Sequence, residues 1–244
     1  MPNAFYDPGH ERTAKVDQLF TAIAPRYDLI NDLQSFGLHR IWKRRVVKMA
    51  GARRGVQALD VCCGTGDIAI LLARKGADVV GLDFNERMLA VALQRVAARG
   101  SHSDQVRSPT FLRGDAHQLP FADNSFDIVT VGYGLRNLAS WQTGMAEMAR
   151  VARPGGRIIV LEFGKPDNPL WRACYFAYLR VFVPVLGWMF CGNAGAYAYI
   201  LESLKHYPAQ WGVEAKMREL GLVNVKIVNL VGGVMSINYG EQPI

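Results

Sequence analysis

The sequence predicts an α/β fold built on a mostly parallel sheet, and three observations support this. First, short apolar, β-branched segments alternate with helical segments between residues 56 and 163, which is the pattern of strands joined by crossover helices. Second, a glycine-rich turn directly follows the first of these strands. Third, 50% of the 244 residues are hydrophobic and 20% are charged, so the chain can bury a large core and is not disordered.

Hydrophobic patterning and turn residues place the individual elements. We expect strands at Val56–Cys62, Asp78–Leu82, Thr110–Arg113, Phe126–Val131, Arg157–Phe163, Leu222–Leu230 and Val234–Tyr239. We expect crossover helices at Asp67–Arg74, Glu86–Ala98 and Gln142–Val151, a turn at Pro154–Gly156, and apolar helices within Leu170–Leu204.

The N-terminal part is predicted to be helical. Apolar residues recur there at three- and four-residue spacing, at Val16, Leu19, Phe20 and Ile23. Pro25 ends or kinks this helix, and a second helix is expected over Leu38–Met49. We therefore expect residues 1–50 to form a helical N-terminal cap. Residues 51–244 then form the core, with an apolar helical insertion at about 168–206.

The apolar insertion is also the segment of the chain that could be a membrane-spanning helix. Trp171–Phe190 is rich in large apolar residues, but Arg172 and Arg180 interrupt it, and Pro184 and Gly187 are expected to break helical continuity. A spanning helix needs about 20 mostly apolar residues with few charges. We therefore expect a buried or interfacial helix, whose exposed side is covered by an apolar ligand, a bilayer surface or a partner subunit.

The net charge of the chain is compatible with several kinds of partner and does not distinguish between them. The net charge of +7 permits a nucleic acid, an anionic membrane or an acidic substrate. The stretches Arg40–Lys48 and Arg53–Arg54 carry basic residues and no acidic one, as in a solvated helix face or a membrane-surface patch. Four cysteines form no CxxC pair and are expected to stay reduced. The polar N-terminus lacks the apolar region of a signal peptide, so a cytoplasmic location is expected.

The glycine loop is the most informative local stretch. It reads Cys62-Cys63-Gly64-Thr65-Gly66-Asp67, after a strand and before a helix. Gly64 and Gly66 allow tight turns and close approach of a ligand. The acidic Asp60 and Asp67 would repel a pyrophosphate, whereas they suit a cationic amino acid group. The loop therefore favours S-adenosylmethionine over a dinucleotide, and a chance glycine-rich turn is the alternative.

Two further strand ends strengthen this interpretation. Asp83 ends the next strand, about 20 residues beyond the loop, where a carboxylate can accept hydrogen bonds from both ribose hydroxyls; the alternative is a helix cap. Asp115 follows the third strand and is suited to the adenine amino group, while Ala116 leaves room for the ring. Together with Phe126–Val129 and Arg153–Arg157, these motifs resemble the ordered series of class I methyltransferases. That resemblance implies a Rossmann-like, seven-stranded sheet with helices on both faces.

Three more stretches carry a closer resemblance, namely Tyr27–Arg44, Gly132–Asn137 and Leu161–Pro166. They resemble the demethylmenaquinone and ubiquinone-pathway C-methyltransferases, and the resemblance runs from about Val16 to Gly233. It implies methyl transfer from S-adenosylmethionine to a ring carbon of a polyprenylated quinol: demethylmenaquinol, the methoxy-benzoquinol intermediate of ubiquinone synthesis, or a phylloquinone-type naphthoquinol. It also implies cofactor contacts at Thr65, Asp83, Asp115 and Ala116. Many members carry Ser where this chain has Gly132, so no contact is expected from that side chain.

Quinol chemistry suggests which residues act. Arg136 can stabilise a developing quinolate, with a structural salt bridge as the alternative. Asn137 can hold a quinol hydroxyl or cap a helix, and Tyr133 can contact the ring or pack in the core. His39 is the cap residue best suited as a base near neutral pH, with a satisfied histidine as the alternative. Histidines and cysteines lack ligand spacing, so no metal is expected.

A lipid-tailed substrate, the basic patch and the apolar insertion together predict peripheral contact with the anionic inner face of the membrane. A homodimer is also possible on sequence grounds. A nucleic-acid methyltransferase is the less favoured alternative, because the chain lacks an Asn-Pro-Pro-Tyr-like tetrad and a suitably placed cysteine nucleophile. No nucleic-acid partner is therefore expected.

Overall fold

The computed structural model describes residues 5, 7, 9, 11–98, 108–191 and 194–244. Within them lie seven strands, which are β1 (Gln57–Val61), β2 (Asp78–Asp83), β3 (Thr110–Arg113), β4 (Phe126–Gly132), β5 (Ala152–Phe163), β6 (Val223–Leu230) and β7 (Met235–Glu241). They form one sheet in the order β3-β2-β1-β4-β5-β7-β6. Strands β1 to β5 pair in parallel, and β7 lies antiparallel to both β5 and β6. The expected mostly parallel, seven-stranded sheet is confirmed.

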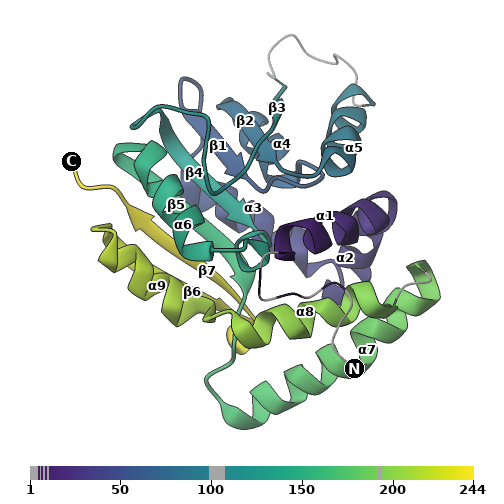
Figure 1. The fold of residues 1–244 in the computed structure, drawn as a ribbon. Helices are drawn as coiled ribbons and strands as arrows, with labels where there is room; N and C mark the ends of the chain where they lie inside the picture. Colours follow the sequence, from purple (N-terminus) through teal and green to yellow (C-terminus); the bar gives the residue numbers. More distant parts are fainter. Residues whose placement is uncertain (1–4, 6, 8, 10, 99–107, 192–193) are drawn as a thin grey trace.

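The helices of the described residues are α1 (Arg12–Ile23), α2 (Tyr27–Ser35), α3 (Leu38–Ala50), α4 (Asp67–Ala73), α5 (Glu86–Ala97), α6 (Trp141–Val151), α7 (Pro169–Cys191), α8 (Ala194–His206) and α9 (Ala209–Glu219). A single 3₁₀ turn, Ala24–Arg26, separates α1 from α2, as the position of Pro25 predicts. Helices α3, α4 and α5 pack on one face of the sheet, and α6 and α9 pack on the other (Figure 1).

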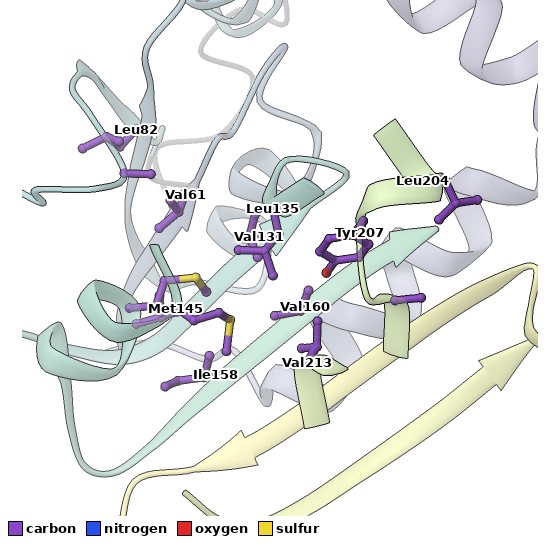
Figure 2. Packing of buried hydrophobic residues seen from close by; sticks show 14 of the residues in the cluster. Val61, Leu82, Val131, Leu135, Met145, Ile158, Val160, Leu204, Tyr207 and Val213 are labelled. Atoms are coloured by element: carbon purple, nitrogen blue, oxygen red, sulfur yellow. The ribbon is translucent and has the colours of Figure 1, made fainter. Parts of the chain in front are cut away.

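Each face of the sheet buries its own hydrophobic cluster. Side chains point to opposite faces along a strand, so Ile158 and Val160 of β5 enter one cluster and Ile159 and Leu161 enter the other. In the first cluster, β5 packs against α6 and α9, and Figure 2 shows these side chains from close by. The second cluster joins the strands to α3 and α4. Packing on both faces therefore holds the strands in place, and with them the loops that follow the carboxyl ends of the parallel strands.

Strand β5 starts earlier than the sequence suggests. We expected a turn at Pro154–Gly156 before a strand from Arg157, but β5 begins at Ala152 and runs through this segment. The register with β4 shifts between Phe126 and Ile128, and Gly155 has a φ of 72°. A bulge of this kind takes up extra residues without ending the strand. The turn expected from the proline and the glycines is therefore an irregularity inside the sheet.

Helix α7 corrects a second expectation. It continues through Pro184 and Gly187, residues expected to break it. A proline inside a helix removes one hydrogen bond and costs about 3 kcal/mol. Packing against α8 and α2 offsets this cost, because Tyr175, Leu179 and Val183 are buried there. By length and composition alone, the segment Pro169–Phe190 is long and apolar enough to cross a membrane. Of the 18-residue stretch on which this rests, 22% is buried.

The N-terminal helices cover the carboxyl ends of the parallel strands. Helix α1 packs on α5, and α2 contacts both α3 and α7 (Figure 1). The amide of Asn85, just after β2, donates from Nδ2 to the Asp17 carbonyl oxygen (3.0 Å) and to Thr21 Oγ1 (2.7 Å). This side chain therefore ties α1 to the end of β2. The division of the chain into residues 1–50 and 51–244 stays a prediction.

Candidate active site

A cleft opens at the carboxyl ends of the parallel strands, under α1. It encloses about 750 Å³, part of it open to solvent. Its floor comes from the ends of β1, β2 and β4 and from the loop after β3, as expected for a ligand site in an open α/β sheet. The described residues that line it include Val16, Asp17, Phe20, Tyr27, Cys62, Gly64, Asp83, Phe84, Asn85, Met88, Asp115, Ala116, His117, Tyr133, Gly134, Asn137 and Leu138.

The cleft is acidic. Asp17, Asp83 and Asp115 line it, and no lysine or arginine does so among the described residues. Opposite charges attract more strongly in a partly buried site than in water. A cationic sulfonium compound therefore fits this cleft, whereas a pyrophosphate would meet uncompensated negative charge.

The two glycines of the loop have different roles. Both have positive φ, 55° at Gly64 and 80° at Gly66, which favours glycine. A Cβ atom on Gly64 would meet no heavy atom within 4 Å, so this glycine keeps space open in the cleft. A Cβ atom on Gly66 would lie 2.7 Å from Phe111 Cζ. Gly66 is therefore needed for packing, and it lines none of the cavities described here.

Asp83 holds the glycine loop in place. Its Oδ2 accepts a hydrogen bond from the Gly64 amide (2.7 Å), and its Oδ1 accepts one from the Asn85 amide (2.8 Å). Each carboxylate oxygen can accept a further bond. Burial raises the pKa of Asp83 above its ordinary value, although these amides act in the opposite direction. Its place at the end of β2, in the wall of the cleft, agrees with a ribose-binding role.

Asp115 is oriented by a residue that the sequence analysis missed. Asp115 Oδ1 accepts a bond from the His117 amide (2.9 Å) and lies 2.6 Å from His117 Nδ1. His117 Nε2 accepts a bond from the Ser140 amide (3.1 Å), so Nδ1 carries the proton and donates to Asp115. Asp115 lines the cleft beside the buried Ala116. This agrees with the expected adenine site.

A smaller cavity of about 320 Å³ continues from the cleft and contains Asp60 and Thr65. The two cavities share Tyr27, Cys62, Gly64, Gly132 and Tyr133. Asp60 accepts bonds from Thr130 Oγ1 (2.7 Å) and from the Ala69 amide (3.0 Å). Burial raises the pKa of Asp60 to about 7. Asp60 is thus largely engaged within the protein and lies beneath the loop, not in the main cleft.

An ionic network surrounds Thr65. Its hydroxyl donates to Asp28 Oδ1 of α2 (2.9 Å) and accepts from Arg95 Nη1 (2.9 Å). Arg95 also pairs with Asp67, as does Lys43. Burial opposes ionisation of Asp67, but these two cations outweigh it and hold the pKa of Asp67 below its ordinary value. The network joins the cap to the glycine loop, and it shows that Lys43, in the basic stretch, faces inward.

The loop after β4 contains three of the predicted catalytic residues. Tyr133 and Asn137 line the cleft, and Tyr133 has a φ of 62°, a strained conformation for a residue with a Cβ atom. Arg136 is buried. Its Nη1 donates to the Tyr133 carbonyl oxygen and to Asn137 Oδ1, both at 3.0 Å. Its Nε lies 3.7 Å from Glu162 Oε1. Arg136 thus holds the loop after β4 through hydrogen bonds within that loop, and it does not line the described cavities.

His39 lies in a third cavity, of about 420 Å³, between the cap and α7. The structure places it apart from the cofactor cleft, with Tyr133 as the residue common to both cavities. His39 Nε2 contacts Asp32 Oδ1 at 2.8 Å. The described lining residues are mostly aromatic or apolar and include Asn31, His39, Trp42, Tyr133, Phe163, Tyr175, Tyr178, Leu179, Val183 and Met235.

The sequence analysis missed four other residues of the cleft. Asp17 and Phe20 of α1 form one wall of the cleft, and Phe84 and Leu138 lie in its lining. Phe84 directly follows Asp83 and Leu138 directly follows Asn137, so their positions next to predicted site residues were the available signal. The contribution of α1 depends on how the cap folds over the sheet, which no local pattern reveals.

The strand order, the antiparallel seventh strand and an acidic cleft beside a glycine loop define a class I S-adenosylmethionine-dependent methyltransferase. Comparison with protein families specifies it further. The chain belongs to the ubiE/COQ5 methyltransferase family, whose model matches residues 9–242. The resemblance drawn from the sequence motifs is thus confirmed.

Individual relatives agree with this assignment. The chain is 38% identical to ubiquinone/menaquinone biosynthesis C-methyltransferase UbiE of Azotobacter vinelandii, over 97% of this chain and 93% of that protein. It is 39% identical to demethylmenaquinone methyltransferase of Desulfitobacterium hafniense, over 96% and 92%. Among solved structures, a SAM-dependent methyltransferase from Aquifex aeolicus has the same fold, with a TM-score of 0.60 and 17% identity, over 88% of this chain and 97% of that one.

Proposed function

We propose that this protein transfers a methyl group to a ring carbon of a polyprenylated quinol. The observation that carries the proposal is the combination of an acidic cleft with an exposed apolar helix. The cleft suits a cationic methyl donor, and Tyr133 links it to a cavity walled by α7. Helix α7 exposes Phe182, Trp188 and Met189 on its outer side. A lipid-tailed acceptor needs both features, and the names of the relatives agree with this substrate class.

The residues of the cleft fit S-adenosylmethionine, which would supply an electrophilic methyl group there. Asp83 would bind the ribose hydroxyls, and Asp115 with Ala116 would bind the adenine. Thr65 and Asp60 would surround the amino acid end in the smaller cavity, with Gly64 keeping the approach open. These residue roles are supported by the position of the two cavities, which are adjacent and have lining residues in common.

The loop after β4 would act on the quinol. Asn137 and Tyr133 line the cleft where the two reactants meet. Arg136 lies one layer behind, with its guanidinium 4.8 Å from the Phe163 ring. Its fixed positive charge would stabilise a ring oxygen that becomes negative, acting through the Asn137 side chain to which it donates.

Turnover of defined quinols tests the proposal. The purified protein should convert a short-chain demethylmenaquinol, under reducing conditions, to a product in which a methyl group replaces a ring hydrogen, a net gain of CH2, when supplied with S-adenosylmethionine. Mass spectrometry of the extracted quinols detects this product, and a benzoquinol run in parallel shows which ring is preferred. A protein that binds S-adenosylmethionine but methylates neither quinol contradicts the proposal.

We further propose that the outer side of α7 rests on a lipid bilayer. Tyr178 Oη of α7 donates to the Gln34 carbonyl oxygen (2.8 Å), so the α2–α3 turn with Phe36 lies beside α7. Phe36 is 81% exposed, and Phe182 stacks on Tyr178 with ring centroids 5.8 Å apart. An exposed group of large apolar residues of this kind suits an interface with lipid. We call Phe36, Phe182, Trp188 and Met189 the apolar face.

Vesicle flotation is expected to show this contact. The protein should bind vesicles containing anionic lipid at low salt, and high salt should release part of it because salt screens exposed charges. Replacing Phe182 and Trp188 together by serine should lower the bound fraction at both salt concentrations.

The same variant separates lipid binding from dimerisation, the other use expected for an exposed apolar surface. Light scattering gives the mass of the wild type and of the double serine variant. One combined result would show that the apolar face contacts a second copy of the chain. The wild type would be a dimer without lipid and would not float with vesicles, and the double serine variant would be a monomer.

A further inference from the structure

The aromatic cavity between the cap and α7 is not explained by packing alone. Its space of about 420 Å³ is partly open, and tyrosine, tryptophan and phenylalanine side chains form much of its wall. We name it the ring pocket, defined by His39, Trp42, Tyr133, Tyr175 and Val183. Flat aromatic walls suit a flat aromatic ligand.

Polar atoms in this pocket lack partners. His39 Nδ1, Tyr133 Oη and Tyr175 Oη are buried, and none has a hydrogen-bond partner among the residues that the structure describes. All three side chains are more than nine-tenths buried. Leaving such a group unpaired costs about 1–3 kcal/mol, and buried polar groups are normally satisfied. Three unpaired groups around one cavity therefore point to a ligand that carries hydroxyl groups.

The imidazole of His39 is set up to accept a proton. Its Nε2 donates to Asp32 Oδ1 (2.8 Å), and Arg40 in turn holds Asp32 from the solvent side, with Nε at 2.7 Å. Because Nε2 carries the hydrogen, Nδ1 of the neutral ring is an acceptor. Burial, and then the charge of Lys43, lower the pKa of His39 below its ordinary value, which favours the neutral ring.

We propose that the ring pocket binds the hydroquinone ring of the substrate and that the Asp32–His39 pair accepts the proton of a ring hydroxyl. Tyr133 and Tyr175 would hydrogen-bond the ring oxygens. Since Tyr133 lines both cavities, a ring held here would lie next to the cofactor cleft at that residue. The inference rests on the proposed function, because it deepens that same site.

The proton transfer balances simply. The O–H bond breaks, its electron pair stays on the ring oxygen, and the proton forms a bond with His39 Nδ1. The resulting imidazolium lies against the Asp32 carboxylate, which stabilises it electrostatically. Asp32 is therefore a positioning residue, and His39 is the residue that contacts the substrate.

Binding without turnover gives the first test. The probe is 4-methoxy-1-naphthol, a two-ring aromatic alcohol, titrated by calorimetry in the absence of oxygen because the naphthol oxidises in air. Val183, which is buried in the pocket wall, is changed to phenylalanine to fill the space. We expect about a tenfold weaker Kd. The matched control is Val223→Phe on β6, at an exposed valine outside the pocket. Equal Kd values in the two folded variants would overturn the assignment of the pocket.

The pH profile gives the second test. Below the pKa of His39 the ring is protonated and cannot accept the proton, so kcat should fall on the acid side. Asp32→Asn should move this fall to lower pH, because Asp32 raises the pKa of His39. A purely structural role would leave the profile in place. Among the described residues, the charged and titratable groups that contact His39 or line the two cavities it borders are Asp28, Asp32, Arg40, Lys43, Arg44, Asp67, Arg74, Arg95, Tyr133, Tyr175 and Tyr178.

The two proposals fail in different ways. If the wild type methylates a quinol but Val183→Phe binds the naphthol normally, the ring lies elsewhere and the proposed function stands. If the wild type binds the naphthol in this pocket yet methylates no quinol, the proposed function fails while the pocket stands.

Discussion

Replacing Arg136 with alanine is expected to lower both the melting temperature and kcat. Arg136 and Glu162 form a buried pair, with side chains 6% and 3% exposed. Removing one partner leaves the other unpaired in the core, which typically costs about 3–5 kcal/mol. If the guanidinium also stabilises a negative ring oxygen, kcat falls on the order of 10²-fold. Calorimetric melting and steady-state kinetics on one preparation measure both effects.

A double variant separates the two roles. Arg136→Met with Glu162→Gln removes both charges at similar volume, which is often neutral for stability. We expect the melting temperature to recover while kcat stays low. Recovery of kcat together with the melting temperature would mean that Arg136 only balances Glu162 and positions the loop, and would rule out its role in the chemistry.

Replacing Asp83 with asparagine is expected to weaken S-adenosylmethionine binding by about 1.5–3 kcal/mol, roughly 10- to 150-fold in Kd. The change removes the charge that would hold the ribose hydroxyls. It also turns one acceptor into a donor, so the carboxylate bonds to the Gly64 and Asn85 amides (2.7 and 2.8 Å) cannot both survive. Both effects act on cofactor affinity, which titration calorimetry measures directly.

Asp78→Asn provides the matched control, because Asp78 begins the same strand that Asp83 ends. Its Oδ2 accepts a bond from Gln57 Nε2 (3.2 Å), away from the cleft. We expect unchanged affinity there. An unchanged Kd in folded Asp83→Asn would remove Asp83 from the cofactor site.

The sheet could be predicted well because its signals are local. Most of the parallel strands are short apolar runs bounded by turn residues, and their alternation with helices indicates that they pair in parallel. Predictions were wrong where packing overrides a local rule. Pro184 does not end α7, because packing against α8 and α2 stabilises the helix. The Pro154–Gly156 segment stays in β5 because a bulge in this strand takes up the extra residues while pairing with β4 continues on both sides of it.

The site was predictable only in part, for a similar reason. Asp83, Asp115 and Ala116 end or follow strands, so topology alone brings them to one edge. The ring pocket joins residues such as Gln34 and Tyr178, which are 144 positions apart. Lys43 lies in a stretch of positive charge but is buried against Asp67. No spacing rule indicates such contacts, because they depend on how the cap and α7 pack.

The cysteines of the glycine loop have a consequence for chemical resistance. Burial raises the pKa of both the Cys62 and the Cys63 thiol well above its ordinary value, and nearby carboxylates add to the effect. Only the thiolate is a strong nucleophile, so both sulfurs stay poorly reactive at neutral pH. Oxidised quinones are electrophiles that alkylate thiolates. With a quinol as the substrate, as proposed above, the oxidised form of that substrate would therefore react only slowly with these two thiols.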